Sequence, residues 1–235
     1  MPSGVDERGL NTPVEQVALL QPAWRAYRLV SSAFPPIAVF EDVLDPADLA
    51  LALAIESLTN ERLLDEAGVL QRVPPEDRIS GPGSTPVMAA FTHIGAANRF
   101  SNGSFGVYYC ASSLKAAIAE TAFHRARFLQ ATGEGPLELT MRAYINSIVK
   151  PLHDVRTIDV LHAPSVDSYP SSQRFAVRFR EAASWGLLYR SVRAPGAECA
   201  AIFRPPAVSI PVQGPHLRYV WDGTAISEVF KISRV

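Results

Sequence analysis

The chain has 235 residues, 48% of them hydrophobic and 19% charged, and its 22 basic side chains nearly balance 23 acidic ones. This composition predicts one large folded domain and excludes a chain that is mostly disordered. A formal net charge of −1 provides no broad basic surface, so we expect neither direct nucleic-acid binding nor attachment to an anionic membrane. A local basic pocket for one phosphate or pyrophosphate is still compatible with this balance.

Cysteine usage and the N-terminal sequence bear on the cellular compartment. Cys110 and Cys199 are too few for a disulfide framework or a four-cysteine metal site, and both stand among apolar residues. The opening MPSGVDERGLN has no basic segment followed by an apolar one, and no apolar run reaches the ~18 residues that span a bilayer. We therefore expect a cytoplasmic protein.

The first part of the chain predicts an arm followed by mixed elements. Residues 1–23 are polar and aperiodic, as expected for an N-terminal arm ahead of a domain at 24–235. The elements expected next are a short strand at 26–32, a helix from Asp45 (its N-cap) to Gly68, a loop at 71–86 rich in proline and glycine, and a buried strand at 87–93 (VMAAFTH).

The second part mixes strands and helices without a regular βαβ order. The expected elements are a strand at 104–111 (SFGVYYCA), a helix at 113–130, a half-buried strand at 136–149, a helix at 172–184 ended by Gly186, short strands near 187–192 and 200–204, and a hairpin that turns at Asp222-Gly223. This order favours an α+β fold, with a mixed sheet core and flanking helices, over a doubly wound sheet.

Common catalytic and nucleotide-binding motifs are absent from the sequence. The segment GPGSTP at 81–86 resembles part of a dinucleotide loop, but it lacks the third glycine, carries two prolines and opens no predicted helix. There is no P-loop, HExxH or GxSxG motif, and His153 and His162 do not have the spacing of a zinc site. A serine triad is left open, although no nucleophile elbow supports one.

The helix at 113–130 carries one glutamate, Glu120. The simple interpretation is a solvated carboxylate paired with Arg127 or His124. However, Phe123 and Ala116 also lie off the expected apolar side, which favours a cleft against this part of the helix. That apolar side comprises Leu114, Ile118, Thr121, Ala122 and Leu129.

Two arginines stand in unusual places for surface charges. Arg28 lies inside a predicted strand, between Tyr27 and Leu29, and Arg99 precedes a Ser-Asn-Gly turn. A buried guanidinium needs an acidic partner or an anionic ligand, because an unpaired charge is costly in a low dielectric. No acidic run lies near either arginine in the sequence, so an anionic ligand is a candidate partner for both.

Three segments together resemble a known family: the early YR, then NRFSNGSFGVYYCASSLKAAIAETAFH, then YPSSQRFAVRFREAASWGLLYRSVRAPG. They are similar to the RES domain, named for its arginine, glutamate and serine, which supplies toxins of bacterial toxin–antitoxin pairs. The resemblance covers the chain from about Trp24 to its C-terminal end.

The resemblance implies a fold similar to ADP-ribosyltransferase-type toxins and consumption of NAD as a substrate, without a metal. Matched by motif, Glu120, Arg99 and Tyr109 are the implied catalytic residues. Arg28 and Ser191 join Arg99 and Tyr109 as implied NAD-binding residues. Ser171 or Ser172 is the alternative to Ser191.

These residue types suit cleavage of the nicotinamide–ribose bond. A carboxylate stabilises the positive charge that develops on the ribose, which is the expected role of Glu120. Arginines bind pyrophosphate oxygens with paired donors, which suits Arg28 and Arg99. The ring of Tyr109 can stack on a flat base, and the Ser191 hydroxyl can donate to a phosphate or to the carboxamide.

Two features depart from the family pattern. The family's Gly-Arg-Trp-Asn segment is ANRFS here, with Phe100 and Ser101 in place of tryptophan and asparagine. Residues 41–92 are expected to form a helical and loop insertion within a RES-like, NAD-binding catalytic domain at 24–235.

The resulting hypothesis is a toxin of a type II toxin–antitoxin system that degrades NAD and transfers ADP-ribose to inorganic phosphate (an NAD phosphorylase) or to water. A protein ADP-ribosyltransferase toxin and a non-catalytic nucleotide-binding regulatory module are the alternatives. The expected partners are NAD, inorganic phosphate and a helix-turn-helix antitoxin of the Xre type.

Overall fold

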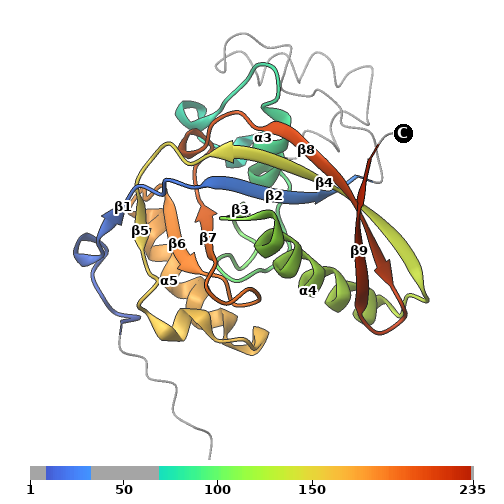
Figure 1. Ribbon diagram of the computed structural model, residues 1–235. Helices are drawn as coiled ribbons and strands as arrows, with labels where there is room; N and C mark the ends of the chain where they lie inside the picture. Colours follow the sequence, from blue (N-terminus) through green and yellow to red (C-terminus); the bar gives the residue numbers. More distant parts are fainter. Residues whose placement is uncertain (1–8, 33–68, 234–235) are drawn as a thin grey trace, which may run out of the picture.

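The computed structural model of the protein describes residues 9–32 and 69–233. Its centre is one nine-stranded sheet with the order β1-β5-β6-β7-β3-β2-β4-β8-β9 (Figure 1). Strands β5 and β6 run parallel, and the other neighbouring pairs are antiparallel. The strands are β1 (Leu19–Leu20), β2 (Arg25–Ser31), β3 (Tyr108–Ala111), β4 (Leu137–Ser147), β5 (Leu152–Asp154), β6 (Gly186–Arg190), β7 (Glu198–Ile202), β8 (Val212–Trp221) and β9 (Ile226–Ile232).

The sheet divides between β2 and β3. These strands share a single residue pair, Tyr27 with Ala111, whereas β2 pairs with β4 along its whole length. A continued ladder would place Leu29 opposite Tyr109. Instead, the side chain of Arg28 donates a hydrogen bond to the Tyr109 carbonyl, at 3.2 Å. The division therefore opens a gap in the middle of the sheet, and a polar side chain reaches across it.

Helices cover both faces of the sheet. Helices α4 (Leu114–Thr132) and α5 (Tyr169–Glu181) lie on one face, and α3 (Thr85–Thr92) lies on the other (Figure 1). Helix α4 begins where the Ser113 hydroxyl accepts a bond from the Ala116 amide, and it ends at Gly133, whose φ of 69° is left-handed. Short 3-10 turns connect the larger elements: Val14–Gln16, Leu70–Arg72, Pro75–Asp77, Asp159–His162, Val166–Ser168 and Pro205–Ala207.

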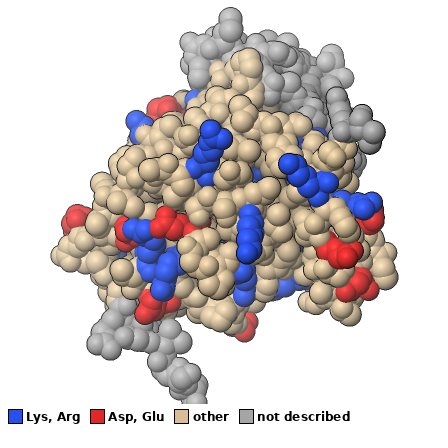
Figure 2. All heavy atoms as spheres, viewed as in Figure 1, with Lys and Arg blue, Asp and Glu red and all other residues tan. Residues whose placement is uncertain are grey.

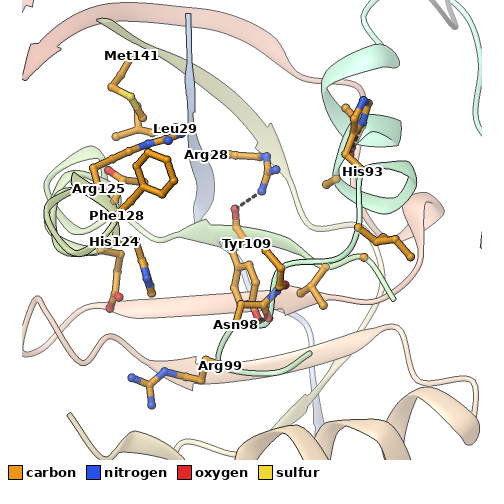
Figure 3. Close-up of a pocket in the computed structure, with 18 of the residues that line it drawn as sticks. Arg28, Leu29, His93, Asn98, Arg99, Tyr109, His124, Arg125, Phe128 and Met141 are labelled. Atoms are coloured by element: carbon orange, nitrogen blue, oxygen red, sulfur yellow. Dashed lines mark hydrogen bonds between the residues drawn. The ribbon is translucent and has the colours of Figure 1, made fainter. Parts of the chain in front are cut away.

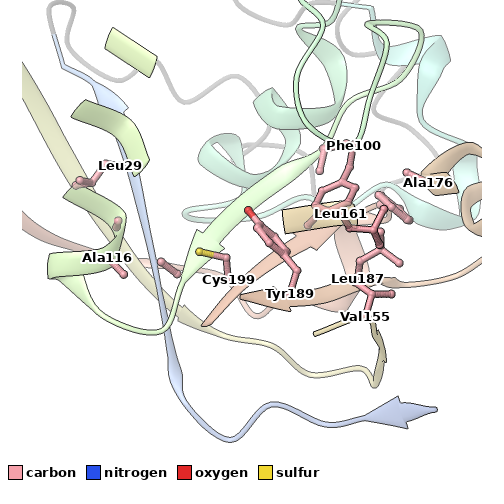
Figure 4. Packing of buried hydrophobic residues seen from close by; sticks show 14 of the residues in the cluster. Leu29, Phe100, Ala116, Val155, Leu161, Ala176, Leu187, Tyr189 and Cys199 are labelled. Atoms are coloured by element: carbon pink, nitrogen blue, oxygen red, sulfur yellow. The ribbon is translucent and has the colours of Figure 1, made fainter. Parts of the chain in front are cut away.

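Each face of the sheet has its own apolar cluster. In β6, Leu187 and Tyr189 face the cluster beneath α4 and α5, whereas Leu188 faces the cluster beneath α3. Figure 4 shows the first cluster, in which Phe100 and Leu161 join Leu187 and Tyr189. Because both faces of β6 are covered, its sequence is a continuous apolar run rather than an alternating one.

The predicted α+β architecture is confirmed, as are the helix at 113–130, the long strand now seen as β4 and the Asp222-Gly223 hairpin between β8 and β9. The prediction of a strand at 87–93 was wrong, because this segment belongs to α3. A short apolar run has no period that separates a buried strand from a buried helix. Pro86, at the start of α3, suits a first helical turn, so GPGSTP does open a helix.

The predicted role of Gly186 was also wrong. Helix α5 ends earlier, and Ala183 adopts a left-handed φ of 55° just beyond it. Gly186 instead begins β6, where a Cβ would lie 2.3 Å from the Ala201 carbonyl oxygen. Glycine is therefore required here by the close approach of β7.

Part of the expected N-terminal arm is attached to the domain. Leu19 and Leu20 form β1 at one edge of the sheet, and the Arg178 guanidinium donates to the carbonyls of Leu10 and Thr12. The helix expected at 45–68 lies outside the described residues. Among the helices described, none combines the length and apolar character needed to cross a bilayer.

Candidate active site

A cavity of about 520 Å³ lies where the sheet divides, with α4 on one side and the end of α3 on the other (Figure 3). This volume is within the ~300–1,000 Å³ typical of small-molecule sites. A smaller hollow of about 80 Å³ shares Arg28, Tyr109 and Glu120 with it. The cavity thus brings together four of the residues singled out in the sequence: Arg28, Arg99, Tyr109 and Glu120.

Arg28 projects from β2 into this cavity (Figure 3). One terminal nitrogen donates to the Tyr109 carbonyl, and the guanidinium carbon lies 4.6 Å from the ring centre of Tyr108. The Nε atom is buried without a hydrogen-bond partner, and burial lowers the pKa of the group. No carboxylate forms an ion pair with Arg28 among the described residues, so its charge lacks a full partner in the protein.

Arg99 lies on the loop before β3 and is 5% exposed. One terminal nitrogen donates to the carbonyls of Leu161, at 2.9 Å, and Ala163, at 3.1 Å. The guanidinium carbon lies 4.7 Å from the ring centre of Tyr169. Backbone dipoles and an aromatic face therefore stabilise this cation in part, which the sequence argument for an acidic partner or an anion did not foresee.

Glu120 is half-buried on α4 and is not a solvated surface carboxylate. Three groups from one loop donate to its Oε1 atom: the Ser191 hydroxyl at 2.7 Å, the Val192 amide at 3.0 Å and the Arg193 amide at 3.2 Å. These bonds fix the carboxylate at the wall of the cavity, and each uses the same oxygen atom. The pairing with Arg127 or His124 expected from helical spacing does not form as an ion pair in the described structure.

Ser191 lies behind Glu120, and it is not among the residues that line the cavity. Besides donating to Glu120, its hydroxyl accepts a bond from the Ala194 amide at 2.9 Å. The geometry therefore makes Ser191 a support for the carboxylate. The alternatives are elsewhere: Ser171 is bonded to Arg174 on α5, and Ser172 is fully buried.

The hydroxyl of Tyr109 forms hydrogen bonds within the protein. The hydroxyl donates to Asn98 Oδ1 at 2.5 Å and accepts a bond from the Phe100 amide at 3.0 Å. Burial raises the pKa of Tyr109, so the phenol stays neutral. Stacking of its ring on a base therefore remains a prediction, whereas its hydroxyl is hydrogen-bonded to Asn98 and Phe100 within the protein.

Sequence reasoning missed several lining residues. Asn98 lies in a segment matched to the family but was given no role, Arg125 was not considered, and His124 was seen only as a neighbour of Glu120 (Figure 3). Burial lowers the pKa of His124, although the Glu120 charge opposes this shift. Ala116 was placed off the apolar side of α4, but it is fully buried against the sheet, because α4 packs along a wider face than its spacing indicated.

The electrostatics of the cavity favour an anion. Arg28, Arg99 and Arg125 line it, and Glu120 is the one carboxylate among the lining residues described. In Figure 2, basic side chains lie across the face shown, including its centre, and acidic ones lie mainly toward its margins. In the part of the chain that the structure describes, no cluster of three or more His, Cys, Asp or Glu side chains could hold a metal ion.

Comparison with known proteins places the chain in a family. The model of the RES domain matches residues 75–222, which is more than half of the chain. The chain belongs to the RES domain family. The RES match includes Arg99, Tyr109, Glu120 and Ser191, whereas Arg28 lies before it. It also includes residues 75–92 of the expected insertion, whose boundaries stay a prediction.

Two individual proteins are similar to this RES-domain chain. "Uncharacterized protein y4oC" of Sinorhizobium fredii (strain NBRC 101917 / NGR234) is 31% identical over 207 residues, which cover 87% of this chain and 86% of that protein. A chain in the crystal structure of the M. tuberculosis MbcT–MbcA toxin–antitoxin complex is 10% identical, with a TM-score of 0.41, and the match covers 88% of this chain and 92% of that one.

Proposed function

We propose that this RES-domain protein is the toxin of a toxin–antitoxin pair and that it degrades NAD at the nicotinamide–ribose bond. ADP-ribose would pass to inorganic phosphate or to water. The observation that carries the proposal is the position of Glu120, a carboxylate held by three donors in a cavity. Two arginines share this cavity, and neither has a carboxylate partner among the residues that the structure describes.

The arrangement of Glu120 suits a reaction that builds positive charge. When the C–N bond breaks, its electron pair leaves with nicotinamide, which becomes a neutral base, and the ribose carbon becomes oxocarbenium-like. A fixed carboxylate stabilises that charge without having to reorganise first. The three hydrogen bonds to Oε1 hold the carboxylate rigidly. Glu120 itself lines the cavity, and none of these three bonds uses its second oxygen.

The arginines of the cavity suit the pyrophosphate. Only one terminal nitrogen of Arg28 is bonded, to the Tyr109 carbonyl, and only one terminal nitrogen of Arg99 is bonded, to the Leu161 and Ala163 carbonyls, among the described residues. Each guanidinium thus keeps donors for phosphate oxygens, which guanidinium groups bind in pairs. A pyrophosphate bound by these cations would hold the attached ribose in the cavity that Glu120 lines.

The acceptor completes the reaction. An oxygen of phosphate or water forms a new bond to the ribose carbon as nicotinamide departs, and an attacking water also gives up a proton. His124 lines the same cavity, and its lowered pKa leaves it neutral near pH 7 and able to accept that proton. A helix-turn-helix antitoxin of the Xre type is the proposed partner that neutralises the activity.

The decisive experiment incubates the purified protein with NAD, with and without phosphate, and identifies the products by mass. We expect nicotinamide together with ADP-ribose 1″-phosphate or free ADP-ribose. Glu120→Gln should keep its fold and lose at least about a hundredfold in turnover, because an electrostatic group aimed at the transition state is removed. Glu134→Gln is the matched control, since Glu134 is exposed just beyond the same helix.

Three results would count against the proposal in different ways. Intact NAD after incubation would support a non-catalytic binding module. ADP-ribose found on a protein side chain would replace the small acceptor by a macromolecular one. Normal bacterial growth and NAD levels on expression of the wild type, without any antitoxin, would reject the toxin.

A further inference from the structure

The loop that carries Arg99 is a tight turn with an unusual number of fixed points. Within the turn, the Asn98 amide donates to the Ser101 carbonyl at 2.7 Å, so Arg99 and Phe100 occupy its corner. The Tyr109 hydroxyl then bonds to both Asn98 and Phe100. Two bonds therefore hold the backbone amides on either side of Arg99, and a third holds the side chain of Asn98.

A second element holds the same turn from outside. Gln173 on α5 donates from Nε2 to the Asn98 carbonyl at 2.7 Å. Asn98 therefore contacts two partners that are distant in the sequence, β3 through its side chain and α5 through its carbonyl. The turn is tied to β3 and to α5 at one residue.

The side chain of Arg99 is fixed at its far end as well. The carbonyls of Leu161 and Ala163, in and just after the 3-10 turn Asp159–His162, accept from one terminal nitrogen. The base of the side chain is set by the turn, and its tip is set by these carbonyls. The side chain is therefore held at both ends in the absence of a ligand.

We propose that Asn98 and Gln173 are positioning residues, which act through the Tyr109 hydroxyl and the turn to hold Arg99 in the conformation that binds the phosphates of the substrate. This proposal rests on the proposed function. It assigns to the Tyr109 hydroxyl a role in ligand affinity rather than in the chemical step.

The physical reason is preorganisation. An arginine side chain loses much conformational entropy when a ligand immobilises it, and a protein that has already ordered it avoids that loss on binding. Loss of the turn should therefore weaken binding and leave the bond-breaking step, at Glu120, largely unchanged. The change should appear in Kd and KM rather than in kcat.

The test compares Asn98→Ala with Asn102→Ala, a control of the same residue type on the same loop. Within the described part of the chain, the Asn102 side chain bonds only to Ser104, and Asn102 does not line the cavity. We expect Asn98→Ala to weaken ADP-ribose binding, measured by calorimetry, by about tenfold, with kcat for NAD within about twofold. Asn102→Ala should change neither. Hydrogen exchange at the Phe100 amide should also accelerate in Asn98→Ala and Tyr109→Phe, because this amide donates to the Tyr109 hydroxyl.

A double-mutant cycle distinguishes positioning from a direct contact. In an Arg99→Ala background, Asn98→Ala should weaken ADP-ribose binding no further. An equal loss in both backgrounds, or wild-type affinity in Asn98→Ala, would overturn the proposal. Gln173→Ala removes the tie to α5 without altering the turn itself, and it provides the same comparison if Asn98→Ala fails to fold. Failure of the wild type both to bind ADP-ribose and to consume NAD would instead reject the proposed function, so the two failures are separable.

Discussion

Arg28→Met should leave the free protein as stable as the wild type or make it more stable, although Arg28 lies inside the sheet. The guanidinium is desolvated, its Nε donor is buried without a partner, and no carboxylate pairs with it among the described residues. Its remaining contacts are one bond to the Tyr109 carbonyl and the face of Tyr108. Methionine can fill the space with a flexible apolar chain.

The magnitude follows from opposing contributions. Loss of the charged hydrogen bond costs about 1.5–3 kcal/mol, and loss of the contact with the Tyr108 ring costs about 0.5–2 kcal/mol. Removal of the unsatisfied donor returns about 1–3 kcal/mol, and removal of a desolvated charge returns a few kcal/mol more. The two sets of contributions overlap, and at the middle of their ranges the return is the larger, so the expected change in the free energy of unfolding is close to zero or a gain of about 2 kcal/mol.

Urea denaturation in phosphate-free buffer, with and without ADP-ribose, is the assay. A ligand at a hundred times its Kd stabilises a protein by about 2.7 kcal/mol, and this gain should be seen in the wild type and be much smaller in Arg28→Met. Arg204→Met is the contrasting control. It leaves the buried Asp77 carboxylate without its bidentate partner and should cost about 3–5 kcal/mol. If Arg28→Met destabilised the free protein by more than 2 kcal/mol and kept the ligand gain, Arg28 would be a structural residue and not an anion-binding one.

Three further predictions concern single groups. Ser191→Ala removes one donor to Glu120 and should lower kcat by about 10–100-fold with little change in KM, so an unchanged kcat would exclude the supporting role. Burial lowers the pKa of His162 to about 4, so as the pH falls the unfolded chain binds a proton at this ring before the folded protein does. Stability should therefore be complete above the ordinary pKa of about 6.5 and fall between pH 6.5 and 4, by less than about 1.4 kcal/mol per pH unit because the ring is partly solvated. His162→Gln should flatten that decline in urea titrations at several pH values, and an unaltered slope would assign the decline to other groups. Burial raises the pKa of Cys110 to about 12 and raises that of Cys199 strongly, so thiol reagents should label both only after unfolding; rapid labelling of the folded protein would contradict their burial.

Local signals in the sequence were sufficient for several elements. Ser113 caps α4 and Gly133 ends it, because hydroxyl capping and left-handed backbone depend on one or two residues. The Asp222-Gly223 turn likewise joins β8 and β9, with a φ of 100° at Gly223. The sequence also singled out the arginines and the glutamate that meet in the cavity, since a charge inside an apolar segment requires a partner.

Tertiary structure decided what each of these charges contacts. Ser191 and Glu120 are 71 residues apart, and Arg99 and Leu161 are 62 apart, so no helical or strand period relates them. The same holds for the division of the sheet at Tyr27 and Ala111, which creates the cavity, and for the side of α4 that buries Ala116. Capping, turn formation and periodicity depend on neighbours within a few residues, whereas hydrogen-bond partners and burial depend on segments that meet only when the chain is folded.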